Sequence, residues 1–312
     1  MKYTRQEVFF GKQVQDFIRG VKVAIVGVGA IGSRSVDLLI RSGVEHIILI
    51  DRDVVEESNL GSQGLFFEED VGLPKVIAAK DVLEGINPDL KTDIHFINLD
   101  HETVDLLKAD LILDCTDNLE ARYLINDYAR KNKIPFVYAS AIRDAGYVFP
   151  VLVDGPCLRC VLHNAKTTET CEASGVLNTI TTLIASLQVN EALKILTKQD
   201  PERDLLYVHL RDNKIENIKV KKDDDCLVCK GEFGYLEGEH ALRMVKHCSS
   251  GNYLVRKDFD FDGVKERLSE FGIVDFGDGF TFKNMLVLRN SLIIKAKSEK
   301  EALKMISQYI GN

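Results

Sequence analysis

The sequence predicts an α/β protein with a Rossmann-like, doubly wound sheet, a structural zinc site and a small α+β domain at its C-terminus. Short β-rich runs alternate with longer helical runs over residues 21–153, which is typical of a parallel sheet with crossover helices. A glycine-rich turn follows the first of these runs, and two C-x-x-C cysteine pairs lie further along the chain. With 312 residues, of which 45% are hydrophobic, the chain is long enough for one large or two modest domains.

Composition argues against several classes of protein. The longest uncharged apolar run, residues 23–31, is far shorter than the roughly 20 residues of a membrane span. The N-terminus lacks the apolar stretch of a signal peptide, so we expect a cytoplasmic protein without membrane association. The chain has 40 Lys and Arg and 48 Asp and Glu, which give a net charge of −8. This charge argues against a broad nucleic-acid interface.

The predicted parallel sheet is built from β-rich runs and periodic apolar helices. One of these helices is expected to begin near Pro74 and to end at Asn87-Pro88. The strands are expected over 21–26, 46–50, 94–97, 111–114 and 136–139, and the helices over 31–41, 74–86, 102–107 and 119–131.

The second half of the chain begins with a polar, irregular stretch over residues 155–175, and a loop of this length in a compact domain is usually functional or mobile. The glycine-rich residues 231–238 are expected to link a first domain, 1–230, to a small α+β domain, 239–312. The expected elements are helices over 176–197, 261–271 and 299–310, with Ser298 and Glu301 forming a capping box, and strands over 205–210, 214–220, 253–255, 275–282, 285–288 and 292–295.

The glycines Gly27, Gly29 and Gly32 form a G-x-G-x-x-G turn between a predicted strand and a predicted helix. Asp51 lies 19 residues after Gly32, at the end of the next strand. This arrangement binds phosphate at the helix N-terminus and a ribose hydroxyl at the carboxylate. The pattern therefore predicts a nucleotide site, and at this point it fits an NAD-dependent oxidoreductase as well as an ATP-dependent enzyme.

Further motifs distinguish between these two kinds of enzyme. In these motifs the chain resembles the ThiF/MoeB/HesA adenylyltransferases, the prokaryotic relatives of ubiquitin-activating enzymes. The resemblance covers about three quarters of the chain, from Arg5-Gln6 to Cys229. The motifs are the run Asp51 to Leu60 with Asp53 and Asn59, then Gly72-Leu73-Pro74-Lys75, Asn87-Pro88, and Asp114-Cys115-Thr116-Asp117-Asn118 with Arg122.

The resemblance implies an ATP-dependent adenylyltransferase acting on the C-terminal carboxylate of a ubiquitin-like sulfur-carrier protein that ends in Gly-Gly. The products would be an acyl-adenylate and pyrophosphate. In the family pattern, Asp51 binds the ribose, Asn59 and Lys75 contact the ATP phosphates, and Asp117 works with Mg²⁺. Arg5 reaches into the partner's site of a homodimer. The candidate catalytic residues are therefore Asp117, Lys75, Arg5 and Cys171, and the nucleotide-binding residues also include Gly27, Gly29, Gly32, Asp53, Asn118 and Arg122.

Elementary chemistry agrees with these roles. A carboxylate that attacks the α-phosphate is already ionised at neutral pH, so positioning and cations rather than a general base lower the barrier. Lys75 and Arg5 would supply fixed positive charge, and Asp117 would hold magnesium. The plainer alternatives are that Lys75 only occupies the first turn of a helix and that Asp117-Asn118 is an ordinary helix N-cap.

One segment departs from the family pattern. Family members usually carry an arginine after Ser-Asn-Leu, where it grips the distal phosphates, but here this segment is Gly61-Ser62-Gln63. Either Arg34 or Arg52 supplies the missing charge, or turnover is weak. A non-catalytic scaffold that binds a carrier therefore stays open, as does an adenylyltransferase for a small-molecule or RNA acceptor.

The cysteines provide the second chemical signal. Two C-x-x-C turns, Cys157/Cys160 and Cys226/Cys229, predict a closed, structural Zn²⁺ site of four thiolates, and the family resemblance includes this tetrad. A redox-active pair and an iron-sulfur site are the alternatives. Cys171 matches the family cysteine that forms a thioester or persulfide with the activated carrier, although some members need only the adenylation step. Packing explains Cys115 and Cys248.

Overall fold

The computed structural model describes residues 2–162, 175–239, 244–246 and 252–311. Its first elements alternate between helix and strand, as the sequence predicts. In chain order they are α1 (Thr4–Phe10), α2 (Lys12–Gly20), β1 (Lys22–Val26), α3 (Gly32–Arg41), β2 (His46–Asp51), η1 (Glu57–Asn59), η2 (Glu68–Asp70), α4 (Lys75–Ile86), β3 (Lys91–Phe96), η3 (Val104–Leu107), β4 (Leu111–Asp114), α5 (Leu119–Asn132) and β5 (Phe136–Ile142).

The later elements complete this sheet and build a second one. They are β6 (Ala145–Val151), α6 (Leu158–Leu162), α8 (Asn178–Leu196), β7 (Leu205–His209), β8 (Lys214–Ile218), α9 (Leu227–Lys230), β9 (Met244–Lys246), β10 (Tyr253–Val255), α10 (Phe261–Ser269), β11 (Val274–Asp275), β12 (Gly279–Phe282), β13 (Met285–Leu288), β14 (Ser291–Ile294) and α11 (Glu299–Tyr309). No described helix is both long and apolar enough to cross a membrane.

The larger sheet is mixed, with strand order β3-β2-β1-β4-β5-β6-β7-β8. Its first five strands are parallel, and β6, β7 and β8 run antiparallel to their neighbours. The chain moves from β1 outward to β2 and β3 and then returns to β4 on the other side of β1. In open α/β sheets, ligands bind at such a switch point, beyond the carboxyl ends of the strands.

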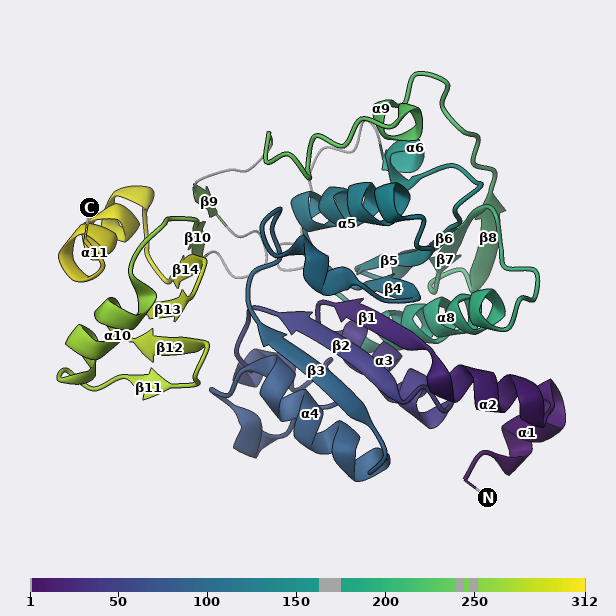
Figure 1. Ribbon diagram of the computed structural model, residues 1–312, viewed down its shortest axis with the longest axis horizontal. Helices are drawn as coiled ribbons and strands as arrows, with labels where there is room; N and C mark the ends of the chain where they lie inside the picture. Colours follow the sequence, from purple (N-terminus) through teal and green to yellow (C-terminus); the bar gives the residue numbers. More distant parts are fainter. Residues whose placement is uncertain (1, 163–174, 240–243, 247–251, 312) are drawn as a thin grey trace.

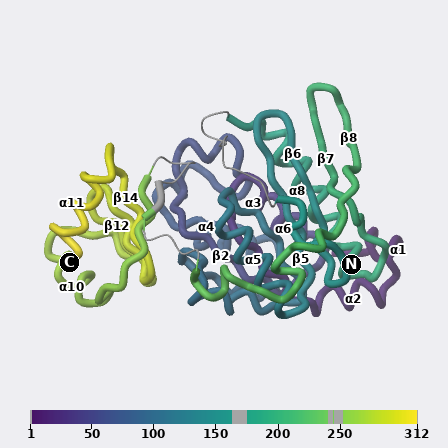
Figure 2. Tube along the Cα trace, turned by 90° about the horizontal axis from the view of Figure 1, so that it is seen from above, coloured from purple at the N-terminus to yellow at the C-terminus, as the bar shows by residue number. Residues whose placement is uncertain are grey.

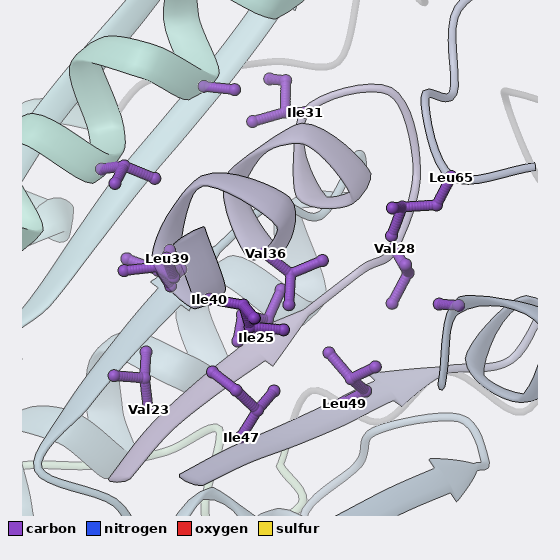
Figure 3. Packing of buried hydrophobic residues seen from close by; sticks show 14 of the residues in the cluster. Val23, Ile25, Val28, Ile31, Val36, Leu39, Ile40, Ile47, Leu49 and Leu65 are labelled. Carbon is purple, nitrogen blue, oxygen red and sulfur yellow. The ribbon is translucent and has the colours of Figure 1, made fainter. Parts of the chain in front are cut away.

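Helices cover the two faces of this sheet, and strand periodicity explains the division. In β1, Val23 and Ile25 belong to a buried cluster with α3, α4 and α8, whereas Ala24 and Val26 belong to a second cluster with α5 and η3. Figure 3 shows the first cluster, where Val36, Leu39 and Ile40 of α3 lie over the side chains of β1 and β2. Because these parallel strands are buried on both faces, their sequences are near-continuous apolar runs.

The smaller sheet belongs to the C-terminal unit, by which we mean the described residues 244–246 and 252–311. Its strand order is β11-β12-β13-β14-β10-β9, and all of its neighbouring pairs are antiparallel. Helices α10 and α11 pack on it around a separate buried cluster. Figures 1 and 2 show the C-terminal unit at one end of the molecule and α1 and α2 at the opposite end.

Several local expectations differ from the structure. The expected sheet lacked the antiparallel strand β6, and the expected strand over 275–282 is two strands with Gly277 in the left-handed region between them. Residues of the expected linker 231–238 pack against the second buried cluster, and the Tyr235 amide donates to Asp127 Oδ2 of α5 at 3.1 Å. The domain division into 1–230 and 239–312 stays a prediction.

The caps of two helices follow their sequences. Asn118 caps α5 by accepting from the Ala121 amide at 2.9 Å, and Ser298 caps α11 by accepting from the Glu301 amide at 3.3 Å. The Glu301 carboxylate accepts from the Lys297 amide at 2.8 Å, one residue earlier than an ideal capping box requires.

The glycine turn between β1 and α3 depends on two close backbone approaches. Gly27 has φ +88°, and a Cβ there would lie 2.8 Å from the Cys115 carbonyl oxygen. A Cβ on Gly32 would lie 1.9 Å from the Gly27 carbonyl oxygen. Gly29 has no such neighbour within 4 Å, so the packing of the turn requires glycine at its first and last positions.

We predict that Gly32→Ala destabilises the protein, whereas Gly29→Ala does not, because only the first forces the backbone of the turn to move. The free energy of unfolding should fall by about 3 kcal/mol for Gly32→Ala and change by less than about 0.5 kcal/mol for Gly29→Ala. Urea unfolding of both variants measures this difference. Equal stability of the two variants would contradict the assigned packing.

Candidate nucleotide site and cysteine cluster

The glycine turn and the end of β2 are joined through Asp51. Its carboxylate accepts from the Val28 amide at 2.6 Å and from the Asp53 amide at 2.8 Å. Burial raises the pKa of Asp51, and the charge of Lys75 and the two amides act in the opposite direction. One buried carboxylate thereby fixes the glycine turn relative to the loop that follows β2.

Lys75 lies among three carboxylates at the same edge of the sheet. Its side chain is only 8% exposed, and its Nζ lies 3.5 Å from Asp53 Oδ2. Burial disfavours the charged amine, but Asp53, Asp51 and Asp117 outweigh burial and raise the pKa of Lys75. The sequence-predicted residues Asp51, Asp53, Lys75 and Asp117 are therefore brought together, and Lys75 remains a cation at neutral pH.

The last residue of β4, Asp114, contributes a second buried carboxylate. Its Oδ1 accepts from the Thr116 amide at 3.0 Å and from the Thr116 hydroxyl at 2.7 Å. Arg122 donates to the Thr116 carbonyl at 2.6 Å and lies 5.1 Å over the Tyr138 ring. Burial raises the pKa of Asp114, and Arg122 opposes this shift. These contacts hold the segment that contains Asp117.

The buried side-chain amide of Gln188, in α8, forms hydrogen bonds with the end of β4. Its Nε2 donates to the carbonyls of Asp114 at 3.1 Å and Val137 at 2.9 Å, and its Oε1 accepts from the Ser35 hydroxyl at 2.8 Å. The Cys115 thiol also lies 3.3 Å from this Oε1, and burial raises its pKa. Gln188 is fully buried, so it joins α3, α8, β4 and β5 at the centre of the site. The sequence offers no distinctive signal for Gln188, because α8 carries several other polar residues, among them Asn190, Glu191 and Lys194.

Two further predicted site residues make other contacts. The Asn59 carboxamide accepts from the Glu56 amide at 3.0 Å and so closes its own turn. Arg5 is exposed on α1, whose Gln6 donates to the Ser42 carbonyl near the amino end of β2. Asp51 lies at the other end of that six-residue strand, about 17 Å away. Arg5 therefore does not belong to the site of its own chain.

The segment that departs from the family pattern packs on the start of α3. The Gly64 amide donates to the Ser33 hydroxyl at 3.1 Å. The Arg34 guanidinium occupies the space over Gly64, because a Cβ there would lie 2.1 Å from Arg34 Cζ. Arg34 Nε is buried and has no hydrogen-bond partner among the described residues. Arg52, by contrast, donates to Asn98 Oδ1 at 2.5 Å.

The four cysteines of the two C-x-x-C turns form one cluster. Their sulfur atoms all lie within 4.8 Å of one another, an arrangement that could hold a metal ion. The Sγ–Sγ distance is 3.8 Å for Cys157 and Cys160, 3.5 Å for Cys157 and Cys226, and 3.6 Å for Cys160 and Cys229. The cluster joins the start of α6 to the start of α9. Cys171 lies outside the described residues.

Solved structures share this fold. MccB of E. coli in complex with ATP superimposes with a TM-score of 0.66 at 23% sequence identity, over 74% of this chain and 75% of that chain. MccB with N-formylated MccA gives a TM-score of 0.67 at 23% identity, over 73% and 75% of the two chains. The large α/β architecture with its mixed sheet is therefore one that known proteins adopt.

Curated relatives are more similar in sequence. The sulfur carrier protein ThiS adenylyltransferase of Bacillus subtilis is 32% identical over 287 residues, which cover 87% of this chain and 85% of that protein. The SAMP-activating enzyme E1 of Haloferax volcanii is 32% identical over 257 residues, covering 80% and 94%. The molybdopterin-synthase adenylyltransferase of Escherichia coli is 33% identical over 239 residues, covering 73% and 96%.

The model of the ThiF family matches residues 3–228, which include the glycine turn, all of the carboxylates around Lys75 and three of the four clustered cysteines. This match and the identity to the relatives confirm the resemblance seen in the sequence. The chain belongs to the ThiF family.

Proposed function

We propose that this protein is an ATP-dependent adenylyltransferase that activates the C-terminal carboxylate of a ubiquitin-like sulfur-carrier protein. The observation that carries the proposal is the buried Lys75 among Asp51, Asp53 and Asp117 beside the glycine turn. Relatives that are named as adenylyltransferases for ThiS, SAMP-type and molybdopterin-synthase systems support the class of acceptor.

The nucleotide would bind along the carboxyl edge of the sheet. Asp51 would accept a hydrogen bond from a ribose hydroxyl, and the amides at the start of α3 would face the phosphates. Lys75 and Asn59 would contact the phosphates. Oxygen ligands suit Mg²⁺, so Asp117, whose segment is held by Asn118 and Arg122, is our candidate to hold it. The ion would offset phosphate charge when bound.

The reaction needs little help from the protein beyond position and charge. A carboxylate oxygen of the carrier attacks the α-phosphorus, a new O–P bond forms, and the bond to the bridging oxygen breaks as pyrophosphate leaves. No proton has to move, because the carboxylate is ionised at neutral pH. Lys75 stays protonated and stabilises the growing negative charge. In a second step, the Cys171 thiolate would displace AMP and form a thioester.

We propose a homodimer in which Arg5 of each chain serves the partner's site. The position of Arg5 at the opposite end of β2 from Asp51 supports this, since Arg5 cannot reach its own site. The same pair of N-terminal helices exposes apolar side chains that a second copy would cover. They are Val8 at 84%, Phe9 at 76% and Phe17 at 51% exposure.

We also propose that Arg34 replaces the arginine that position 62 lacks. Its guanidinium lies over Gly64 in the segment that contains Ser62, and its Nε has no partner among the described residues. Arg52 is less suited to this role because it is already bonded to Asn98. A buried guanidinium N–H without an acceptor suits an anionic ligand such as phosphate.

The cysteine cluster fits Zn²⁺, which we propose as its metal. With Zn–S bonds of about 2.3 Å, the sulfurs of a tetrahedral site lie about 3.8 Å apart. Three of the six Sγ–Sγ distances, at 3.5–3.8 Å, agree with this spacing, and all four sulfurs lie within 4.8 Å of one another. The metal would stabilise the fold by joining α6 to α9 and would take no part in the reaction, because four thiolates leave no open coordination position.

We predict that the wild-type chain catalyses ATP–pyrophosphate exchange with a carrier such as ThiS, and that Asp117→Asn lowers the rate about 100-fold or more by weakening magnesium and phosphate binding. Asp81→Asn, an exposed change on α4, is the matched control and should exchange at the wild-type rate. Exchange that is absent with every Gly-Gly carrier, or unchanged in Asp117→Asn, would contradict the proposal.

We predict that Arg34→Ala lowers pyrophosphate exchange by about 100-fold, because removing a phosphate-binding charge costs a few kcal/mol in the transition state. The double variant Arg34→Ala/Ser62→Arg should recover much of the lost rate, since it returns the cation to the same segment. Ser62→Ala serves as the control. A wild-type rate in Arg34→Ala, or no recovery in the double variant, would argue against this role.

We predict about one zinc per chain by mass spectrometry of metals in freshly purified protein. Cys226→Ser should lose the zinc and melt several degrees lower, because metal binding contributes to folding stability. Cys171→Ser should keep both the metal and the melting temperature. Metal-free wild-type protein, or iron in place of zinc, would disprove this assignment.

A further inference from the structure

The C-terminal unit is seated at the carboxyl end of β3, next to the nucleotide site. Phe276 packs edge-on against Phe96, the last residue of β3, with the ring centroids 6.1 Å apart. A Cβ on Gly279 would lie 2.7 Å from the Phe96 ring, so glycine makes room for it. Phe96 pairs in register with Asp51 at the end of β2. Only one strand spacing therefore separates this contact from the buried carboxylate.

Asn290, in the turn between β13 and β14, binds the loop that follows β3. Its Nδ2 donates to the Asn98 carbonyl at 2.8 Å and to Asp100 Oδ2 at 2.7 Å. The other oxygen of Asp100 accepts from the amides of Glu102 and Thr103 at 3.1 and 3.0 Å. A side chain of the C-terminal unit thus takes part in the network that shapes this loop.

The same loop connects directly to the residue beside Asp51. Asn98 is 2% exposed, and its Oδ1 accepts from Arg52 Nη1 at 2.5 Å. This bond assigns the amide orientation of Asn98 and leaves its Nδ2 buried without a hydrogen-bond partner among the described residues. A buried donor without an acceptor is costly unless a ligand completes it.

A second contact reaches the other side of the site. Arg256, which follows β10, donates to Glu120 Oε1 at 2.8 Å, and the two side chains are only 14% and 27% exposed. Glu120 lies in the first turn of α5, two residues after its N-cap Asn118 and three after Asp117. The C-terminal unit therefore contacts both the loop after β3 and the start of α5, which follows β4. Strands β3 and β4 flank β2 and β1 in the sheet.

We propose that the C-terminal unit completes the adenosine end of the nucleotide site. Asn290 and Arg256 act as positioning residues for the two loops, and Asn98 Nδ2 donates to the bound adenosine. This inference rests on the proposed ATP-dependent function. It assigns a role to the part of the chain beyond the family match, which ends at residue 228.

The test is ATP binding to the full-length chain by titration calorimetry with magnesium and without carrier. Asn290→Ala should weaken ATP binding about 10-fold, since it frees the loop that holds Asn98. Asn290→Asp should weaken it further, because its carboxylate would face Asp100 and a carbonyl. Asn284→Ala, an exposed asparagine in the neighbouring turn, is the matched control and should bind like wild type.

Kinetics separate positioning from stability. In pyrophosphate exchange, Asn290→Ala should raise KM for ATP about 10-fold and leave kcat and KM for the carrier unchanged. If Asn290→Ala does not fold, Arg256→Ala replaces it, and Arg256→Lys should retain most of the affinity by keeping the charge. Wild-type ATP affinity in folded Asn290→Ala and Asn290→Asp, or equal weakening in Asn284→Ala, would overturn the inference. A wild-type chain that binds no ATP would refute the proposed function itself.

Discussion

The architecture of the site depends on one buried carboxylate. Asp51 accepts from the Val28 amide of the glycine turn and from the Asp53 amide of its own loop, and it is only 8% exposed. A buried charge is costly unless hydrogen bonds and a nearby cation stabilise it, and Lys75 is that cation. Because the two oxygens of Asp51 hold two separate loops, the turn, β2 and α4 form one rigid frame. Any ligand at the carboxyl edge of the sheet meets groups that are already in position.

The rest of the protein extends this frame outward. Gln188 holds the end of β4 against α3 and α8, so Asp117 is presented from a fixed loop. The C-terminal unit adds Asn290 and Arg256 on the far side, and its Leu286 and Leu288 belong to the same buried cluster as the strands of the large sheet. The two sheets thus share part of one buried cluster and meet at the carboxyl end of β3. We propose that both contribute to the nucleotide site.

The sequence predicted the fold class and the centre of the candidate site, and it failed where contacts are distant along the chain. Regular strand and helix periods, the glycine turn, Asp51, Lys75 and Asp117 follow local patterns, and the structure brings these residues together. Asn290 contacts Asn98, 192 positions away, and Ser35 contacts Gln188, 153 positions away. No local sequence pattern predicts either contact. The strand β6 was missed because its sequence contains Gly146 and Pro150, which are unfavourable inside a strand. The choice between Arg34 and Arg52 likewise needed the packing on Gly64.

We propose that a nucleoside triphosphate binds along the frame fixed by Asp51. A crystal structure of the full-length chain with magnesium and a non-hydrolysable ATP analogue tests it most directly. We predict a ribose hydroxyl on Asp51, adenosine beside Asn98, and phosphates between the start of α3, Lys75 and Arg34. A triphosphate bound elsewhere on the protein, or a ribose that does not contact Asp51, would contradict the account.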